Sequence, residues 1–294
     1  MWTGSIIAVD WGTTNRRAYR LSPYGICEDE FEDDKGITSV ERGGFPVAVA
    51  EIRARLGDLP LLMAGMIGSN RGWVEAPYVP CPAGADALAA RLVMVDGQRA
   101  AIVPGLSYLA PGRSDVMRGE EVQLFGAVAK GLVPPTCLVC HPGTHNKWAT
   151  VEDGRILSFR TVMTGELFNL LREKSILSDW LHEPVAIGPA FLDGARRGLE
   201  GEALTAELFS VRAGVLLGQR SKDEAASFTS GLLIGADIRT GLHGEDEKEI
   251  VVMGRPELTS LYAAVLGELG RTAREIDGER AFIAGILQIK GQIA

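Results

Sequence analysis

The chain has 294 residues, of which 46% are hydrophobic and 23% charged, and its formal net charge at pH 7 is −8. This length favours two domains, and the composition is typical of a globular protein that can form a sizeable core. The acidic balance argues against a nucleic-acid binder or a protein that binds anionic membranes, because such proteins are normally basic.

Targeting signals are not expected in this sequence. The apolar run near the N-terminus is too short for a signal peptide, and no apolar stretch reaches the length of about 18 residues that a membrane helix needs. Four cysteines in a chain of this length do not form a disulfide scaffold and suit a reducing compartment. These features predict a cytoplasmic protein, and the sequence leaves open a homodimer.

Short apolar runs alternate with amphipathic segments along the chain. The runs expected to form buried strands are residues 6–9, 61–63, 101–103, 137–140 and 250–253. The segments expected to form helices, from their apolar spacing, are residues 45–56, 120–130 and 257–269. This alternation predicts an α/β fold with layered sheets.

The first predicted strand leads into a motif that returns much later in the chain. Residues 6–18 read IIAVDWGTTNRRA, and residues 138–149 read LVCHPGTHNKWA. Each is a buried strand followed by Gly-Thr-x-Asn, a basic residue and a return strand. The matched pairs are Gly12/Gly143, Thr13/Thr144, Asn15/Asn146, Arg16/Lys147 and Ala18/Ala149. A separation this long is not a solenoid repeat, and it predicts two similar domains that each begin with a glycine-tipped hairpin.

Both hairpins have residues suited to binding phosphate. A glycine lets the backbone approach a ligand closely, and successive N–H groups with threonine hydroxyls form an anion-binding nest. The candidate phosphate ligands are Gly12, Thr13, Thr14, Gly143, Thr144, His145 and Lys147. Asp10 ends the first strand and is the candidate Mg²⁺ ligand, through water. Ordinary hairpin turns are the alternative interpretation, and the matched pair of turns argues against it.

Other nucleotide and catalytic motifs do not compete with these hairpins. The sequence contains no Walker A motif, no G-x-G-x-x-G after a strand and no G-x-S-x-G elbow. Cys137 and Cys140 have C-x-x-C spacing, but they fall in a predicted strand, where residues three apart point to opposite faces. This placement argues against a redox or zinc site.

Five blocks of sequence carry a resemblance to a known family. Residues 8–17 resemble the first phosphate hairpin of the sugar kinase, hsp70 and actin superfamily. Four further blocks resemble the 2-dehydro-3-deoxygalactonokinase family: residues 64–78 (AGMIGSNRGWVEAPY), 116–126 (VMRGEEVQLFG), 142–148 (PGTHNKW) and 159–168 (FRTVMTGELF). The resemblance extends from Ile6 to about Ile289 and therefore covers nearly the whole chain.

The resemblance implies a fold and an activity. The fold would be two ribonuclease-H-like (actin-like ATPase) domains with mixed sheets flanking an inter-domain cleft. Residues 1–115 would hold the first hairpin and the sugar-acid site, and residues 116–294 the second hairpin and the adenosine site. The activity would be Mg²⁺-dependent transfer of the ATP γ-phosphoryl group to the 6-hydroxyl of 2-dehydro-3-deoxy-D-galactonate, in galactonate catabolism. Such transfer depends mainly on positioning and on stabilisation of phosphate charge.

The resemblance also points to the acid–base residue. In related glycerol-kinase-like enzymes, an acidic residue at the start of the helix before the second hairpin takes the hydroxyl proton. Here Glu120 is favoured over Glu121, with Asp115 as third choice, although the chain has Glu-Glu where those relatives have Asp and is one residue shorter. The alternative is that these acidic residues only stabilise the helix dipole.

Binding of the substrate and of adenosine requires further groups. A substrate carboxylate needs arginine or clustered N–H donors, and its hydroxyls need polar side chains on a loop. The candidate substrate ligands are Asn15, Arg16, Ser69, Asn70 and Arg118, with Arg71 nearby in a family block. Gly254, in the turn between a predicted strand and a predicted helix, is the candidate adenosine contact.

Two other functions stay open. One is a kinase of the same superfamily with a different acceptor, such as 2-dehydro-3-deoxygluconate, or one that forms an acyl phosphate. The other is a non-catalytic actin-like protein, either filament-forming or regulatory. Repressors of this fold carry an N-terminal helix-turn-helix, for which the early first strand leaves no room.

Overall fold

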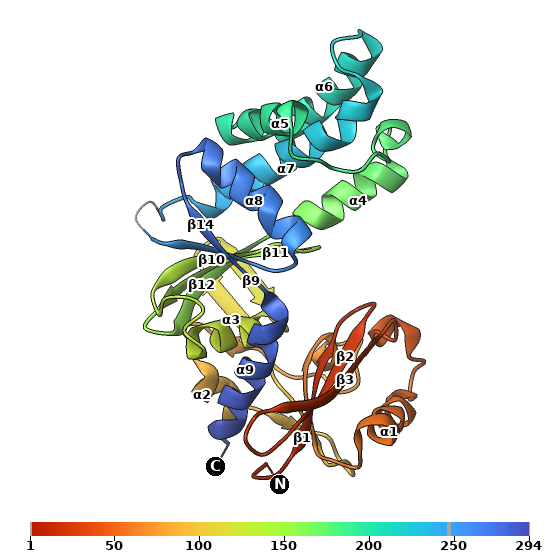
Figure 1. Cartoon of the computed structure of the whole chain (residues 1–294), viewed down its shortest axis with the longest axis vertical. Helices are drawn as coiled ribbons and strands as arrows, with labels where there is room; N and C mark the ends of the chain where they lie inside the picture. The colour runs from red at the N-terminus through yellow and green to blue at the C-terminus, as the bar shows by residue number, and fades with distance from the viewer. Residues whose placement is uncertain (1, 246–247, 294) are drawn as a thin grey trace. The chain divides into compact units, whose positions relative to one another are not determined.

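The computed structural model describes residues 2–245 and 248–293, except for the side chains of residues 279 and 280. The chain forms two compact units (Figure 1). Unit 1 comprises residues 1–136, 150–159 and 278–294, and unit 2 comprises residues 137–149 and 160–277. The expected domain boundary at residue 115 stays a prediction.

A six-stranded mixed sheet forms the centre of unit 1. In spatial order its strands are β3 (Cys27–Asp33), β2 (Arg16–Leu21), β1 (Ile6–Trp11), β4 (Leu61–Gly65), β7 (Ala100–Ile102) and β6 (Val93–Met94). Strand β1 pairs antiparallel with β2 and parallel with β4. Five residues of β1 pair with five residues of β4. Because these two strands are parallel, their carboxyl ends lie at the same edge of the sheet.

Smaller elements complete unit 1. A three-stranded sheet has the order β5 (Val79–Pro80), β8 (Leu106–Ala110) and β9 (Arg113–Met117). The helices are α1 (Phe45–Leu56), α2 (Ala85–Ala89), α3 (Glu120–Ala129) and α9 (Gly278–Gly291), with 3-10 turns η1 (Ile37–Ser39) and η2 (Met66–Gly68). Helix α1 buries one apolar stripe, and its Phe45 ring lies between the rings of Trp11 and Trp73. Tryptophans near the first hairpin therefore pack in the core.

A second mixed sheet has the order β12 (Arg155–Val162), β11 (Asn146–Glu152), β10 (Cys137–His141), β13 (Ile250–Met253) and β14 (Ala273–Ile276). Strand β10 pairs parallel with β13, and β13 pairs parallel with β14. Strands β10 and β13 are almost fully buried, as their continuous apolar sequences predict. Cys137 and Cys140 are free thiols within β10, and burial raises the pKa of both.

The helices of unit 2 are α4 (Thr164–Lys174), α5 (Pro189–Glu200), α6 (Leu204–Leu216), α7 (Ala225–Gly241) and α8 (Pro256–Glu268), with 3-10 turns η3 (Ser178–Trp180) and η4 (Lys222–Glu224). Helices α5 and α7 lie side by side in backbone contact (Figure 1). A Cβ added at Gly194 would lie 2.1 Å from the Phe228 carbonyl oxygen, and one added at Gly231 would lie 2.0 Å from that of Phe191. Helix α7 is buried along most of its length.

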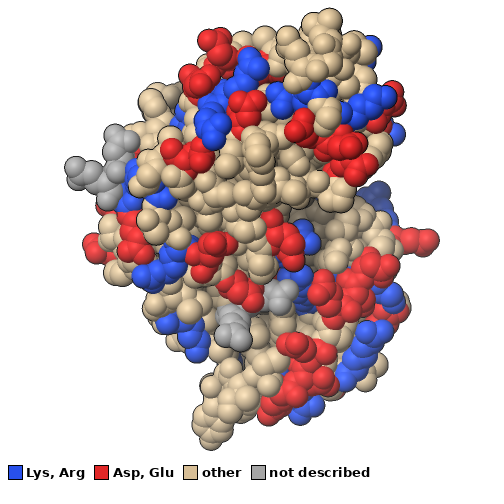
Figure 2. All heavy atoms as spheres, turned by 45° about the horizontal axis from the view of Figure 1, so that its top comes forward, with Lys and Arg blue, Asp and Glu red and all other residues tan. Residues whose placement is uncertain are grey.

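The predicted α/β class with mixed sheets is confirmed. Every predicted strand is a strand, and the three predicted helices begin and end within one residue of their expected positions. None of the helices in the described part of the chain is both long and apolar enough to span a membrane. On the face shown in Figure 2, acidic and basic side chains are interspersed.

Candidate functional site

The first hairpin turns at residues 12–15, between β1 and β2. The Gly12 N–H donates to the Asn15 carbonyl oxygen at 2.9 Å. The carbonyl oxygens of Gly12, Thr13 and Thr14 accept hydrogen bonds from the backbone N–H groups of residues 36–38, at 2.8 to 3.2 Å. Thr13 and Thr14 are exposed, and their own N–H groups donate to no acceptor among the described residues. The turn therefore presents N–H groups outward, as an anion site requires.

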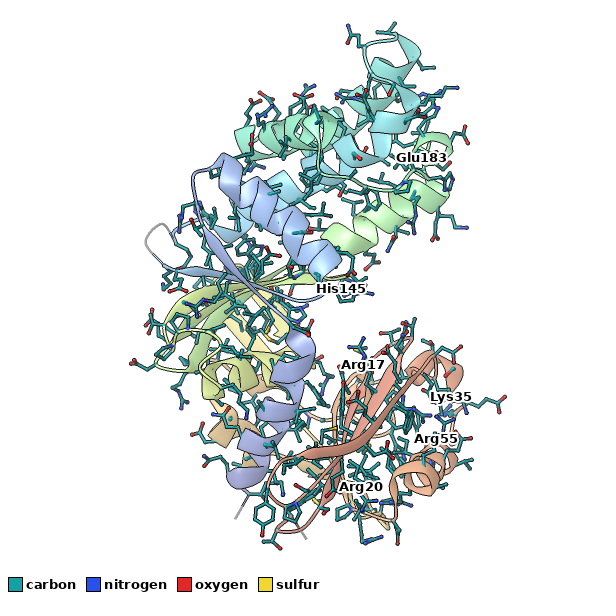
Figure 3. The ribbon with its side chains drawn as sticks, in the orientation of Figure 1. Arg17, Arg20, Lys35, Arg55, His145 and Glu183 are labelled. Carbon is teal, nitrogen blue, oxygen red and sulfur yellow. The ribbon has the colours of Figure 1, made fainter. Side chains whose placement is uncertain are left out.

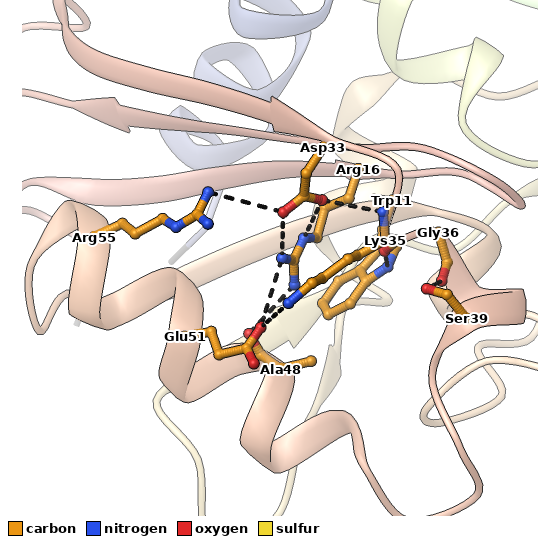
Figure 4. Close-up of polar contacts among 9 residues, drawn as sticks. All are labelled: Trp11, Arg16, Asp33, Lys35, Gly36, Ser39, Ala48, Glu51 and Arg55. Atoms are coloured by element: carbon orange, nitrogen blue, oxygen red, sulfur yellow. Dashed lines mark hydrogen bonds and ion pairs between the residues drawn. The ribbon is translucent and has the colours of Figure 1, made fainter.

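The base of this hairpin is held from inside unit 1 (Figure 4). Arg16 is 1% exposed, and its guanidinium donates to both carboxylate oxygens of Asp33, at 3.1 and 2.7 Å, and to the Ala48 carbonyl oxygen at 3.3 Å. The Trp11 indole N–H donates to the Lys35 carbonyl oxygen at 3.0 Å. Burial would raise the pKa of Asp33, but the bonds and charge of Arg16 outweigh it and lower that pKa. Arg16 therefore lies under the hairpin and away from solvent.

Two glycines bring the start of α3 against the end of the central sheet. Gly65 has a φ of +93°, and a Cβ added there would lie 2.8 Å from the Trp11 carbonyl oxygen and 3.4 Å from Asp10 Oδ1. Gly119 has a φ of +108°, and its Cβ would lie 3.2 Å from Gly65 Cα. Both conformations favour glycine. The result places the acidic first turn of α3 close to Asp10.

The two glutamates of that turn have different environments. Glu121 is fully buried, and the Gly119 N–H donates to both of its carboxylate oxygens, at 2.9 and 2.8 Å. Burial, followed by the charge of Glu120, raises the pKa of Glu121 to about 8. Glu120 is partly exposed, and its Oε2 accepts from the Arg118 N–H at 3.1 Å. Asp115, the third candidate base, lies on β9, where its Oδ1 accepts from the backbone of the next residue.

The raised pKa of Glu121 predicts a pH-dependent stability. The folded chain keeps a proton that the unfolded chain releases above about pH 4.5, so the free energy of unfolding should fall as pH rises toward 8. Glutamine does not ionise, so Glu121→Gln should remove this decrease in the free energy of unfolding. The variant should match wild type near pH 5 and exceed it by roughly 2 to 4 kcal/mol near pH 8.5. Urea unfolding at both pH values tests this, and an equal difference at the two values would contradict it.

Arg118 lies over a loop that carries two predicted substrate ligands. Its Nη2 donates to the Ala76 carbonyl oxygen at 2.6 Å, and its guanidinium lies 4.4 Å from the Tyr78 ring centre. Its Nε and Nη1 are buried and have no hydrogen-bond partner among the described residues. In the same loop, the Ser69 hydroxyl donates to the Met66 carbonyl oxygen at 2.7 Å, whereas Asn70 is exposed. Asn70 is thus the more accessible of the two polar residues.

The second hairpin turns at residues 142–145, between β10 and β11. The Gly143 N–H donates to the Asn146 side-chain oxygen at 2.7 Å, and no atom would lie within 4 Å of a Cβ at Gly143. Thr144 and His145 are both exposed. Figure 3 labels His145. Lys147 is buried, and its ammonium donates to the His145 carbonyl oxygen at 3.2 Å. The lysine charge therefore lies directly behind the turn.

Helix α4 begins against this second turn. A Cβ added at Gly165 would lie 2.3 Å from the Gly143 carbonyl oxygen, and the Glu166 N–H donates to the Thr144 carbonyl oxygen at 2.9 Å. The Glu166 carboxylate also contacts His145 Nε2. The partial positive charge of a helix N-terminus adds to the attraction of the turn for anions. This segment lies in the family block of residues 159–168, and sequence reasoning assigned no role to Glu166.

An apolar pocket lies beside the second hairpin within unit 2. Gly143 and Asn146 form one side of it, and the apolar wall comes from α4, α7 and α8. The wall residues are Phe168, Leu233, Ile234, Leu258 and Leu261. Gly254 lies in the adjoining turn, where a Cβ would be 3.5 Å from the Pro142 carbonyl oxygen. Such a pocket, apolar with polar groups at one side, suits a flat heterocycle attached to a charged tail.

The structure thus gathers most predicted site residues into two groups. In unit 1, Asp10, Glu120 and Arg118 lie around Gly65 and Gly119, and Asn15 lies at the exposed hairpin tip, where its amide contacts Glu32 at 3.4 Å. In unit 2, Gly143 lines the apolar pocket, Gly254 lies in the turn next to Pro142, and Lys147 contacts the backbone of the second hairpin. Arg16 and Ser69 are the predicted substrate ligands whose polar groups are already bonded inside unit 1.

Paired α/β units with mixed sheets and glycine-tipped hairpins place the chain in the actin-like ATPase fold class. The family model for 2-keto-3-deoxy-galactonokinase matches residues 10–289. The chain belongs to the 2-keto-3-deoxy-galactonokinase family.

Relatives of the chain agree with this assignment. The 2-dehydro-3-deoxygalactonokinase of Escherichia coli (strain K12) is 38% identical over 296 residues, covering 99% of each chain. The probable 2-dehydro-3-deoxygalactonokinase of Rhizobium meliloti (strain 1021) is 37% identical, covering 96% of this chain and 95% of that one. The crystal structure of a putative 2-dehydro-3-deoxygalactonokinase from Sinorhizobium meliloti has a TM-score of 0.91 at 36% identity, over 97% of both chains.

A more distant structure is similar in fold alone. The (R)-2-hydroxyglutaryl-CoA dehydratase component A of Acidaminococcus fermentans has a TM-score of 0.53 at 13% identity, covering 99% of this chain and all of that one. The actin-like architecture is therefore shared well beyond the sugar-acid kinases.

Proposed function

We propose that the chain transfers the γ-phosphoryl group of ATP to the 6-hydroxyl of 2-dehydro-3-deoxy-D-galactonate, in the cytoplasm, as a step of galactonate catabolism. The observation that carries the substrate assignment is the full-length match to a curated kinase named for this substrate. The outward N–H groups of the first hairpin and the open glycine of the second support the use of a polyphosphate.

Phosphate oxygens would bind to the N–H groups of Thr13 and Thr14 in one unit. In the other unit they would bind at Gly143 and Thr144, with the Lys147 charge behind the turn. The adenosine moiety would occupy the apolar pocket next to Gly254. Each turn is held by hydrogen bonds within its own unit, so each can stabilise phosphate charge with little reorganisation. The expectation that both hairpins bind one nucleotide stays a prediction.

Asp10 suits a magnesium ion. Its carboxylate is a hard oxygen ligand on the partly exposed residue next to the end of an otherwise buried strand, and its Oδ1 lies close to Gly65. Bound Mg²⁺ would neutralise phosphate charge. Asp10 would hold the ion through water molecules.

Glu120 is the proposed base. As the substrate hydroxyl oxygen bonds to the γ-phosphorus, its proton passes to the Glu120 carboxylate and the bond from phosphorus to the ADP oxygen breaks. Glu120 is accessible, whereas Glu121 is enclosed and bonded to the Gly119 N–H. Arg118 and Asn70 would bind the carboxylate and hydroxyls of the sugar acid. The buried guanidinium of Arg16 would act only by holding the first hairpin.

A substrate panel tests this proposal. The purified chain with Mg-ATP is assayed for ADP release against 2-dehydro-3-deoxy-D-galactonate, 2-dehydro-3-deoxy-D-gluconate, neutral hexoses and simple carboxylic acids. We expect the galactonate derivative to have the highest kcat/KM, with phosphorus NMR placing the phosphate on the primary hydroxyl. Preference for the gluconate epimer would move the assignment to that acid. Turnover of hexoses alone, or of no acceptor with ATP-dependent light scattering, would reject it.

Arg118→Ala is expected to raise KM for the sugar acid by about 10- to 100-fold, and KM for ATP by much less, because a charge-assisted bond to the substrate carboxylate is lost. Initial rates against each substrate, with thermal unfolding as a check on the Ala76 contact, measure this. Arg55→Ala is the matched control, since Arg55 is an exposed arginine of the same unit that lies over Phe31. Equal rises in both KM values would count against a carboxylate contact.

A further inference from the structure

A buried carboxylate lies beneath the second hairpin. Asp237, on α7, is 1% exposed and accepts hydrogen bonds from four side chains. The Trp148 indole N–H donates to Oδ1 at 2.8 Å, and the Thr164 hydroxyl donates to Oδ2 at 2.7 Å. The Tyr262 hydroxyl and the Asn146 amide also donate to Oδ2. One carboxylate thus joins β11, α4 and α8 to α7.

Asn146 connects Asp237 to the second phosphate turn. Its amide nitrogen donates to Asp237, which leaves its amide oxygen facing the Gly143 N–H at 2.7 Å. An amide has one donor end and one acceptor end, so a partner that only accepts fixes which end faces the glycine. With the amide reversed, its oxygen would lie against the carboxylate and its nitrogen against the glycine N–H. The orientation of Asn146, and with it the Gly143 bond, depends on Asp237.

The same carboxylate orders one side of the apolar pocket. Three of its four donors, Asn146, Thr164 and Tyr262, are pocket-lining residues, while Asp237 itself lies behind them. Its own position is constrained, because α7 is in backbone contact with α5. Burial raises the pKa of Asp237 and the four donors oppose that shift. A fully paired buried group of this kind specifies one arrangement of its neighbours.

We propose that Asp237 is a positioning residue for nucleotide binding, which fixes the second phosphate turn through Asn146 and the pocket wall through Thr164 and Tyr262. This inference rests on the proposed function, since it assigns the nucleotide to that turn and pocket. Asp237 touches no ligand in this scheme and acts only through the residues that do. The competing interpretation is a carboxylate that stabilises the fold alone.

Kinetics of Asp237→Asn in the full-length chain separate these interpretations. Asparagine has the same shape but only one acceptor oxygen, so its amide hydrogens oppose the donors on one side of the group, either Trp148 or the three donors to Oδ2. We expect KM for ATP to rise about 10-fold or more and kcat to fall about 10-fold, because small displacements of phosphate ligands are costly, while KM for the sugar acid stays within about 2-fold. A stability loss with unchanged KM for ATP would overturn the proposal.

Thr229→Val is the matched control. Thr229 is buried in the same helix, and its hydroxyl donates to the Ala225 carbonyl oxygen of that helix at 2.7 Å. It should lose stability without a change in either KM. If Asp237→Asn does not fold, Tyr262→Phe removes one donor and keeps the carboxylate. It should raise KM for ATP about 3-fold, and an unchanged value would count against the proposal.

A double-mutant cycle and hydrogen exchange test the route through Asn146. Asn146→Ala and Asp237→Asn should be non-additive, so that the double variant is within about 2-fold of the worse single variant in kcat/KM for ATP. The backbone amide of Gly143 should exchange faster in each variant. Additive kinetic effects, or unchanged exchange in Asp237→Asn, would refute the route. If the wild-type chain does not phosphorylate the sugar acid, the proposed function is rejected. The hydrogen-exchange result still tests the role of Asp237, because it does not depend on activity.

Discussion

Asp10→Asn is expected to lower kcat at least 100-fold while leaving the thermal unfolding temperature within a few degrees of wild type. The amide has the same shape as the carboxylate, so the partly exposed end of β1 can accommodate it. It lacks the negative charge that a hard divalent cation requires. Steady-state rates with saturating ATP and acceptor, repeated over a range of Mg²⁺ concentrations, measure the loss and show whether higher Mg²⁺ restores part of it.

Asp29→Asn provides the control for this experiment. Asp29 is an exposed acidic residue on β3 of the same sheet, so the change in net charge is identical. Its rate should equal that of wild type. A wild-type rate for Asp10→Asn, with unchanged dependence on Mg²⁺, would remove Asp10 from the proposed metal site and leave the hairpins as the basis of phosphate binding.

Glu120→Gln is expected to have the second largest effect, a loss of about 10²- to 10⁴-fold in kcat with little change in either KM, as for removal of a general base. Glu120 begins α3 and is partly exposed, so the substitution should cost little stability. Rates from pH 5 to 9, with both substrates saturating, measure the effect.

Glu121→Gln is the neighbouring comparison. Its side chain is enclosed and bonded to the Gly119 N–H, so glutamine should keep at least one of these bonds and most of the activity. If Glu121→Gln collapses while Glu120→Gln stays near the wild-type rate, the two roles are exchanged. If both stay active, Asp115 is the remaining candidate from the sequence.

The internal repeat was sufficient to predict both hairpins, but not the orientation of their side chains. In each turn the glycine N–H is bonded by the residue three positions later. Asn15 uses its backbone oxygen and leaves its side chain exposed, whereas Asn146 uses its side-chain oxygen and is buried. Identical residues at matched positions therefore differ in role, because Asn146 bonds to the buried carboxylate of Asp237, whereas the Asn15 amide contacts the exposed Glu32. The repeated sequence alone does not predict this difference between Asn15 and Asn146.

Arg16 shows that the sequence also does not reveal which charged side chains pair inside the fold. An arginine next to a phosphate turn suggests a ligand contact, and a single sequence contains no sign that Asp33, on another strand, would pair with it inside the unit. Asp237 is the converse case. It is the one acidic residue of a helix that is buried along most of its length, and its partner Asn146 is 91 positions away in sequence. The two residues meet because α7 packs on the sheet. Apolar periodicity can predict that a segment forms a helix, but not which strand residues the helix will contact.

The contact between α5 and α7 has a consequence for anyone engineering this enzyme. Exchanging a glycine inside a helix for alanine ordinarily raises helix stability by about 1 kcal/mol, which makes it a routine choice for thermostabilisation. At Gly194, Gly198, Gly231 and Gly235 the added methyl would lie 2.0 to 2.2 Å from a carbonyl oxygen of the opposite helix. Overpacking then outweighs propensity, so libraries built on helix scores should leave these four positions untouched.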